Sequence, residues 1–152
     1  MKKYYLAYGS NLNTKEMQNR CPFSKLVGKS VLTNYRLVYK GLPNYSYLTI
    51  EKCEGEQTPI GIYEITDIDE ANLDIYESYP DFYNKINISI KLNDIDITAI
   101  TYIMNQNYNY NLPSLNYVLR CVEGYRNFGF DTNILTNALL TTQQNMSKKL
   151  IK

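Results

Sequence analysis

Apolar and polar residues alternate along several short stretches of the chain with the period of two that indicates half-buried β-strands. In its first half, these stretches are residues 3–8, 25–40, 45–50 and 60–65. The alternation is clearest at Tyr35, Leu37 and Tyr39. A cluster of turn-forming residues at 41–44 separates the second stretch from the third, and the polar residues 52–58 predict a loop before the fourth.

Two helices are expected among these strands. The polar residues 13–20 predict a short helix after the first strand. Asp67, with Glu70 three residues later, resembles a capping box that has Asp in the Ser/Thr position. We expect this second helix to run to about Ser78, before Pro80 ends it.

The second half of the chain begins with strand patterns at 83–92 and 95–104. Asn93 and Asp94 between them predict a tight turn, and therefore an antiparallel hairpin. Residues 105–112 are polar and rich in tyrosine, which favours a loop.

The C-terminal part of the chain predicts two more helices. One runs from Ser114 to about Phe128, where Gly129 can cap it. Its expected inward face is formed by Leu115, Val118, Leu119, Val122 and Tyr125. Asp131 is expected to start the last helix, with residues 143–152 frayed.

Strands in succession with helices between and after them indicate an α+β fold, built on a small closed or half-closed barrel. The length of 152 residues, with no internal repeat and no long linker, predicts a single domain over residues 1–152. The net charge of +1, from 16 basic and 15 acidic residues, gives no electrostatic case for nucleic acid binding. No signal peptide and no apolar span of about twenty residues is visible, so we expect a cytoplasmic protein without a membrane partner.

The residue inventory limits the possible chemistry. The chain has no histidine, which excludes Ser-His-Asp and Cys-His triads and imidazole metal sites. The three cysteines are scattered without a CxxC spacing, so we expect reduced thiols and no zinc site. An acid–base catalyst in this chain must therefore be a carboxylate, a tyrosine, a lysine or a cysteine.

The stretch Tyr8-Gly9-Ser10-Asn11-Leu12 is the first candidate for chemistry. A strand that stops at glycine and turns into a helix leaves several backbone N–H groups unpaired and pointing outward. Such a nest of donors suits a carboxylate, a phosphate or a developing oxyanion. On spacing alone, an ordinary turn between a strand and a helix is equally open.

The second candidate is Glu77, near the end of the helix predicted from Asp67. The negative end of the helix dipole disfavours the ionised form of a carboxyl group placed there. Apolar and aromatic surroundings would raise its pKa toward neutrality, where the group can both accept and donate a proton. The alternative is a solvated glutamate at a helix end, which is the more frequent case for glutamates.

Three motifs follow one another along the chain: Tyr8-Gly9-Ser10-Asn11-Leu12, then Glu77 with Tyr83, then Pro113-Ser114-x-x-Tyr117 with Gly124, Tyr125 and Gly129 downstream. In these motifs and their order, the sequence resembles the gamma-glutamylcyclotransferase family, also called AIG2-like or BtrG-like. The resemblance extends from Tyr4 to about Asp131. It implies a small mixed β-barrel flanked by helices, with a substrate cavity at its mouth.

The resemblance also implies roles for particular residues. The γ-glutamyl end of the substrate would be held through backbone N–H groups by Tyr5, Leu6, Ala7, Tyr8, Gly9, Ser10, Asn11 and Leu12. Glu77 falls on the family's acid/base glutamate, and Tyr83 and Tyr117 fall on tyrosines that line the cavity. Ser78 departs from the glycine that often follows the catalytic glutamate, which puts substrate size in question.

The implied activity is that of a γ-glutamyl cyclotransferase, which needs no metal or cofactor. The α-amine of a γ-glutamyl amide attacks its own γ-carbonyl, releasing 5-oxoproline and a free amine. Arg36 and Arg126 are candidates for contacting the substrate's α-carboxylate. The alternative function is a non-catalytic module that binds a small molecule or anion on the same fold. The sequence leaves open which amine is released and whether the protein is a monomer or a homodimer.

Overall fold

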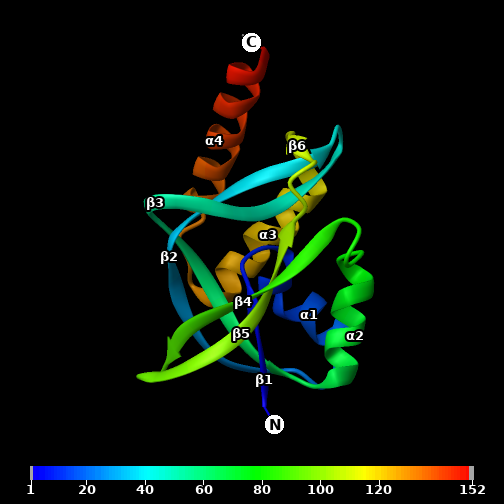
Figure 1. Cartoon of the computed structure of the whole chain (residues 1–152), viewed down its shortest axis with the longest axis vertical. Coiled ribbons are helices and arrows are strands. Elements are labelled where there is room, and N and C mark those ends of the chain that lie inside the picture. The colour runs from blue at the N-terminus through cyan, green and yellow to red at the C-terminus, as the bar shows by residue number, and fades with distance from the viewer. Residues whose placement is uncertain (1, 151–152) are drawn as a thin grey trace.

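The computed structural model describes residues 2–150, which form one curled six-stranded sheet with helices packed around it (Figure 1). The strands are β1 (Lys3–Ala7), β2 (Lys25–Leu42), β3 (Tyr45–Ile65), β4 (Tyr83–Leu92), β5 (Ile95–Met104) and β6 (Asn109–Tyr110). The helices are the 3-10 helix η1 (Ser10–Leu12), α1 (Thr14–Arg20), α2 (Asp67–Tyr76), α3 (Leu115–Phe128) and α4 (Asn133–Leu150).

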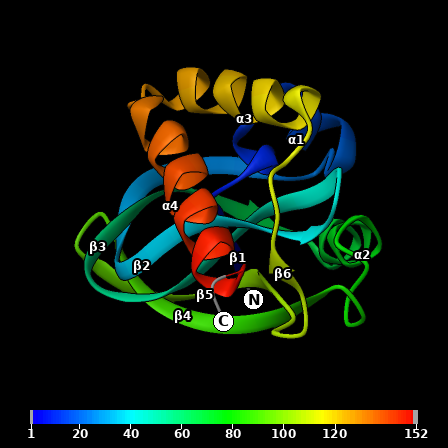
Figure 2. The ribbon, with the colours of Figure 1, turned by 90° about the horizontal axis from the view of Figure 1, so that it is seen from above.

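The sheet is mixed, with the order β4-β5-β1-β3-β2-β6. Its pairs are antiparallel except for β1 and β5, which run parallel and pair at Tyr5 and Ile100. Figure 2 shows the sheet curling into a half-barrel, with α3 along one side of it and α4 running across in front of the curled strands. The predicted α+β fold with helices around a mixed sheet is therefore confirmed, in the half-closed form.

The long hairpin of β2 and β3 corrects one prediction. Residues 52–58 do not form a loop, because β3 continues through them. The pairing shifts register between Thr33 and Tyr35 of β2, and the Gly55 N–H there donates to the Asn34 side chain at 3.0 Å. Most of the polar residues of this bulged segment are exposed. Their polarity therefore reflects exposure within a strand and not the end of one.

The start of α2 corrects a second prediction. The capping box uses Thr66 and Asp69 in place of Asp67 and Glu70. The Thr66 hydroxyl accepts from the Asp69 N–H at 3.1 Å, and the Asp69 carboxylate accepts from the Thr66 N–H at 3.0 Å. Threonine supplies the oxygen at the position just before the first helical turn, so the helix begins one residue earlier than the pattern of acidic residues indicates.

This capping geometry makes a testable prediction. Replacing Thr66→Ala removes the side-chain acceptor and should lower the free energy of unfolding by ~1 kcal/mol, as measured by denaturant titration. Asp67→Ala is the matched comparison, because the Asp67 side chain is 85% exposed and pairs only at the surface with Lys3. An equal loss of stability in the two variants would contradict the assignment of Thr66 as the cap.

The β4–β5 hairpin is confirmed, with Asn93 and Asp94 at φ values of 50° and 65° in its two-residue turn. The loop predicted at 105–112 is only partly correct. Within it, the two residues of β6 pair with Lys40 and Gly41 of β2. Strand pairing of so short a segment depends on a distant partner, which no local pattern reveals.

The ends of α3 agree with the sequence, and its inward face agrees in part. Of the residues predicted to face inward, Tyr125 is buried and Val118 and Val122 pack against the core. The Ser114 side chain caps the helix by accepting from the Tyr117 N–H, and Gly129 closes it at a φ of 71°. Leu115 and Leu119, predicted to face inward, are 72% and 53% exposed. The buried face consists of Tyr117, Cys121, Gly124, Tyr125 and Phe128. Small residues and aromatic rings occupy this face because α3 lies close against the backbone of η1.

The last helix is longer than predicted. Asp131 accepts from the Asn133 N–H at 2.9 Å, as expected for a helix start, but α4 continues through most of the segment predicted to fray. The buried Thr142 hydroxyl accepts from the Tyr39 N–H at 2.9 Å, which ties α4 to β2. Of residues 143–152, the last two lie outside the described part of the chain.

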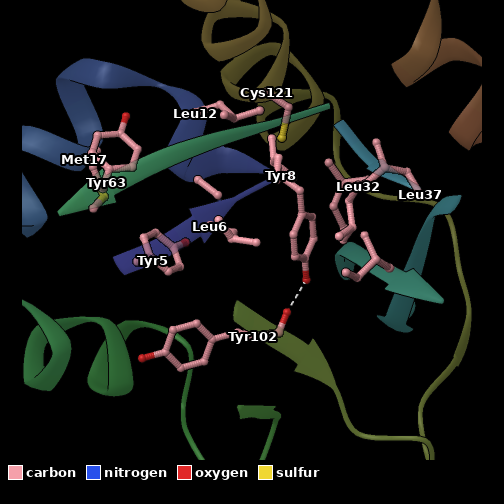
Figure 3. Close-up of a cluster of buried hydrophobic side chains, with 14 of the residues drawn as sticks. Tyr5, Leu6, Tyr8, Leu12, Met17, Leu32, Leu37, Tyr63, Tyr102 and Cys121 are labelled. Carbon is pink, nitrogen blue, oxygen red and sulfur yellow. Dashed lines mark hydrogen bonds between the residues drawn. The ribbon is translucent and has the colours of Figure 1, made fainter. Parts of the chain in front are cut away.

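The core fills the inside of the curled sheet and joins β1 to α1 and α3 (Figure 3). Leu6, Leu12 and Met17 are almost completely buried there. The Tyr8 hydroxyl crosses the core and donates to the Tyr102 carbonyl of β5. Among the described helices, none is long and apolar enough to cross a membrane.

Candidate active site

A cavity of about 500 Å³ opens where the end of β1, the end of α2 and the β2–β3 turn meet. This volume is in the range of small-molecule sites. Nine of the cavity residues are tyrosines: Tyr5, Tyr8, Tyr45, Tyr47, Tyr76, Tyr83, Tyr102, Tyr108 and Tyr117. The others are Gly9, Ser10, Asn11, Leu42, Leu48, Glu77, Ser78, Asp81, Phe82 and Arg120. Of these tyrosines, only Tyr5, Tyr8, Tyr83 and Tyr117 were predicted from the sequence as site residues.

The stretch after β1 turns into η1 at Gly9. The Leu12 N–H donates to the Gly9 carbonyl and the Asn13 N–H donates to the Ser10 carbonyl, both at 3.0 Å. The amides of Gly9, Ser10 and Asn11 precede the first intrahelical donor, so the helix itself supplies no partner for them. Because all three residues line the cavity, this loop is suited to present N–H groups to a negatively charged oxygen.

The structure divides the predicted substrate-binding stretch into two sets. Tyr5, Tyr8, Gly9, Ser10 and Asn11 line the cavity. Leu6, Ala7 and Leu12 do not, because their side chains are buried in the core. Alternation along β1 separates Tyr5 from Leu6, since neighbouring side chains of a strand point to opposite faces.

Glu77 lies at the C-cap of α2, one residue beyond the last helical position. Its N–H donates to the Leu73 carbonyl at 2.9 Å, and Ser78 next to it has a φ of 50°, which turns the chain. The helix therefore ends earlier than the predicted Ser78. Glu77 lines the cavity, and within residues 2–150 its carboxylate has no hydrogen bond or ion pair.

Burial raises the pKa of Glu77 from its ordinary value of 4.5 to about 7, against an opposing effect of the Arg20 charge. Burial, and then the Glu77 charge, also raise the pKa of Tyr5, Tyr8 and Tyr83. The carboxylate therefore lies among tyrosines that keep their protons at neutral pH. A carboxyl group with a pKa near neutrality can act both as a base and as an acid.

Tyr83 and Tyr117 both line the cavity and hold the same residue of β3. The Tyr83 hydroxyl donates to the Leu48 carbonyl at 2.7 Å, and the Leu48 N–H donates to the Tyr117 hydroxyl at 3.1 Å. Because their hydroxyl groups are engaged with the backbone, these tyrosines shape the cavity with their rings.

The structure adds a polar group of residues that sequence reasoning missed. The Tyr76 hydroxyl lies 3.1 Å from the Ser10 hydroxyl and accepts from Arg120 at 3.0 Å. The Arg20 guanidinium lies 3.3 Å from the centre of the Tyr76 ring and donates to the Asn11 side chain. The only available signal for Arg120 was its position three residues after Tyr117 on the same helix, which places both on one face.

The two arginines proposed from the sequence do not line the cavity. Arg36 donates to Glu51 at 2.6 Å in the β2–β3 hairpin, and Arg126 is exposed near the end of α3. None of the three cysteines lines the cavity. Among residues 2–150, no three His, Cys, Asp or Glu side chains are grouped so that they could hold a metal ion.

A sequence profile described as gamma-glutamyl cyclotransferase, AIG2-like, matches residues 5–119. No curated protein matches the chain at a significant level. A solved structure described as a gamma-glutamyl cyclotransferase has a TM-score of 0.79 and 20% identity, covering 91% of this chain and 86% of its own.

Two further solved structures are similar. An uncharacterized protein from Homo sapiens has a TM-score of 0.76 and 23% identity, covering 84% of this chain and 80% of its own. An AIG2-like protein from Mus musculus has a TM-score of 0.56 and 17% identity, covering 77% of this chain and 82% of its own. At these identities, the structural likeness shows a shared fold.

Proposed function

Because the chain belongs to the gamma-glutamyl cyclotransferase, AIG2-like family, as its three motifs predict, we propose that it is a γ-glutamyl cyclotransferase with Glu77 as acid and base. The observation that carries this proposal is the state of Glu77. Its carboxylate is unpaired within the described residues, faces the cavity and has a pKa of about 7. A carboxylate kept only for structure would normally be paired or solvated.

The proposed reaction starts with the substrate's α-ammonium group, which must lose a proton before its nitrogen can act as a nucleophile. Glu77 accepts that proton. The free amine attacks the γ-carbonyl carbon, a C–N bond forms, and the carbonyl oxygen becomes an oxyanion. N–H groups of the loop from Gly9 to Asn11 are the candidate donors for that oxyanion.

Collapse of this intermediate breaks the bond between the γ-carbon and the leaving nitrogen. Glu77 returns its proton to that nitrogen, and the new ring nitrogen, which still carries the second proton of the former amine, releases it to water or to the departing amine. The products are therefore 5-oxoproline and the free amine. The nitrogen that attacks belongs to the substrate, so the protein needs no nucleophile of its own. One carboxylate whose pKa lies near neutrality can perform both transfers in succession.

The direct test is to incubate the purified protein with a panel of γ-glutamyl amides and detect 5-oxoproline. Formation of 5-oxoproline in proportion to enzyme concentration is the expected result. If the protein binds a γ-glutamyl compound with measurable affinity but forms no 5-oxoproline, the chain is a binding module on this fold and the proposal fails.

The pKa of Glu77 predicts the pH dependence. The base must be ionised in the free enzyme, so kcat/KM should fall about tenfold for each pH unit below about 7 and level off above it. The measurement is the initial rate at low substrate concentration across this pH range. A limb centred near the ordinary glutamate value of 4.5 would contradict the assignment of Glu77 as the titrating base.

A further inference from the structure

The cavity has a second region, formed by aromatic rings, that the proposed chemistry does not use. Phe82 lies at its centre, with ring centroids 5.9 Å from Tyr47, 4.6 Å from Tyr108 and 5.2 Å from Tyr83. Tyr47, Phe82 and Tyr108 line the cavity and are only partly buried by the protein. We call these three residues the aromatic box.

Two tyrosines separate the aromatic box from the polar groups of the cavity. The Tyr117 ring lies 5.0 Å from the Tyr47 ring and 5.8 Å from the Arg120 guanidinium carbon, and its hydroxyl group lies beside Gly9. Tyr83 contacts Phe82 and is close enough to Glu77 for that charge to raise its pKa. The reacting centre between Glu77 and Gly9 therefore has polar groups on one side and the aromatic box on the other.

The charged side chains Arg120 and Asp81 are divided between the same two sides of the cavity. Arg120, the one cation among the cavity residues, lies on the polar side, where it contacts Tyr76 and pairs with Glu16. The charge next to the aromatic box is Asp81, the neighbour of Phe82 in the chain. Within residues 2–150, the Asp81 carboxylate has no ion pair or hydrogen bond. It would therefore repel a second carboxylate placed in this region.

We propose that the aromatic box is the leaving-group site, and that the favoured substrate is a γ-glutamyl amide of an amine that carries an aromatic ring and no carboxylate of its own. The inference rests on the proposed cyclotransferase function. The polar side receives the γ-glutamyl end, whose amine, carboxylate and carbonyl need hydrogen-bond partners. The leaving amine then occupies the box, where its ring packs edge-to-face against Phe82 and Tyr47.

Three substrates test this assignment: γ-glutamyl-phenethylamine, γ-glutamyl-phenylalanine and γ-glutamyl-methylamine. The first two differ in one carboxylate, and the first and third differ in a benzyl group. We expect kcat/KM to be highest for the phenethylamine derivative, by roughly three- to tenfold over each of the others. Equal values for the phenethylamine and methylamine derivatives would overturn the inference while leaving the proposed function intact.

Two variants locate the preference in the structure. Phe82→Leu keeps an apolar side chain but removes the ring, so it should lower kcat/KM for the phenethylamine derivative by roughly threefold or more relative to kcat/KM for the methylamine derivative. Asp81→Asn should lower the ratio of kcat/KM for the phenethylamine derivative to kcat/KM for the phenylalanine derivative by roughly threefold or more. The matched controls are the exposed Phe23→Leu and Asp96→Asn, neither of which lines the cavity, and both should retain the parent preferences.

Binding to the Glu77→Gln variant distinguishes the failure of the inference from the failure of the proposed function. If no amide is turned over, calorimetry with the same three compounds still measures their order of affinity. The phenethylamine derivative binding most tightly would support the aromatic box as a site. No preference among the three, in turnover or in binding, would overturn it.

Discussion

Glu77→Gln is expected to reduce turnover of a γ-glutamyl amide by ~100- to ~10,000-fold, which is the usual contribution of one general acid–base group. Glutamine keeps the size of the side chain but cannot exchange a proton. The loss should fall in kcat, with a smaller effect on substrate affinity, because the backbone donors around Gly9 and Ser10 are unchanged. It can exceed this range, since one carboxylate serves two proton transfers in the proposed cycle.

The same substitution should not weaken the fold. Burial raises the pKa of Glu77 to about 7, so the folded protein holds that proton more tightly than the unfolded chain does. Stability contributed by the protonated form is complete below about pH 4.5 and is lost as the pH rises through about 7. At pH 8 the parent therefore contains an ionised, half-buried carboxylate that is unpaired within the described residues. Neutral glutamine removes that cost, so the variant should melt at the same or a higher temperature.

The matched control is Glu54→Gln, which makes the same chemical change at an exposed position of the β2–β3 hairpin. It should leave both turnover and melting temperature nearly unchanged. A thiol mechanism is tested in parallel by Cys53→Ser, since Cys53 is the one cysteine that is not buried. A folded Glu77→Gln protein that turns over within a few-fold of the parent would show that another group moves the protons.

The local features of this fold could be predicted from the sequence. The glycine that ends β1, the Asn93–Asp94 turn and the caps at Ser114 and Gly129 are each decided by the φ values or hydrogen bonds that particular residue types allow. These choices need no knowledge of distant parts of the chain. Among them, the glycine after β1 locates the loop at which the cavity forms.

The parts that the sequence did not predict depend on contacts between distant segments. Tyr76 lies beside Ser10 and Arg120 only because α2 and α3 meet at the end of β1. Arg120 was overlooked for the same reason that Leu119 was wrongly placed inside. Apolar periodicity along α3 predicted a leucine-rich inner face, whereas close packing against η1 selects the face that carries Gly124.

Gly124→Ala is expected to lower kcat/KM by roughly 100-fold, because small displacements of catalytic groups can cost that much. A Cβ at this position would lie 2.5 Å from the Asn13 nitrogen and 2.7 Å from the Leu12 carbonyl carbon. Both are backbone atoms, so no side-chain rotation relieves the overlap. Either α3 or the loop from Gly9 to Leu12 must move, and the candidate oxyanion donors belong to that loop.

The thermodynamic effect of this substitution should be smaller than the kinetic one. Forcing an extra methyl group into a packed contact costs about 1–3 kcal/mol. Alanine regains up to ~1 kcal/mol, because it favours the helix more than glycine does. The Asn13 side chain, which donates to the Arg120 carbonyl at 3.3 Å and to Glu123 at 3.2 Å, also ties the two segments together. The variant should therefore fold, with a displaced loop.

Gly55→Ala is the matched control for Gly124→Ala. Gly55 has a φ of 86° and open space around its position, so alanine strains the backbone there without contacting any neighbour. It should lower the melting temperature while leaving kcat/KM near the parent value, because Gly55 lies in the β2–β3 bulge and does not line the cavity. If Gly124→Ala instead kept parent turnover after a similar loss of stability, the position of the η1 loop would not limit the reaction. The oxyanion would then need donors from elsewhere in the cavity, and the hydroxyl groups of Ser10 and Tyr76 would be the next to remove.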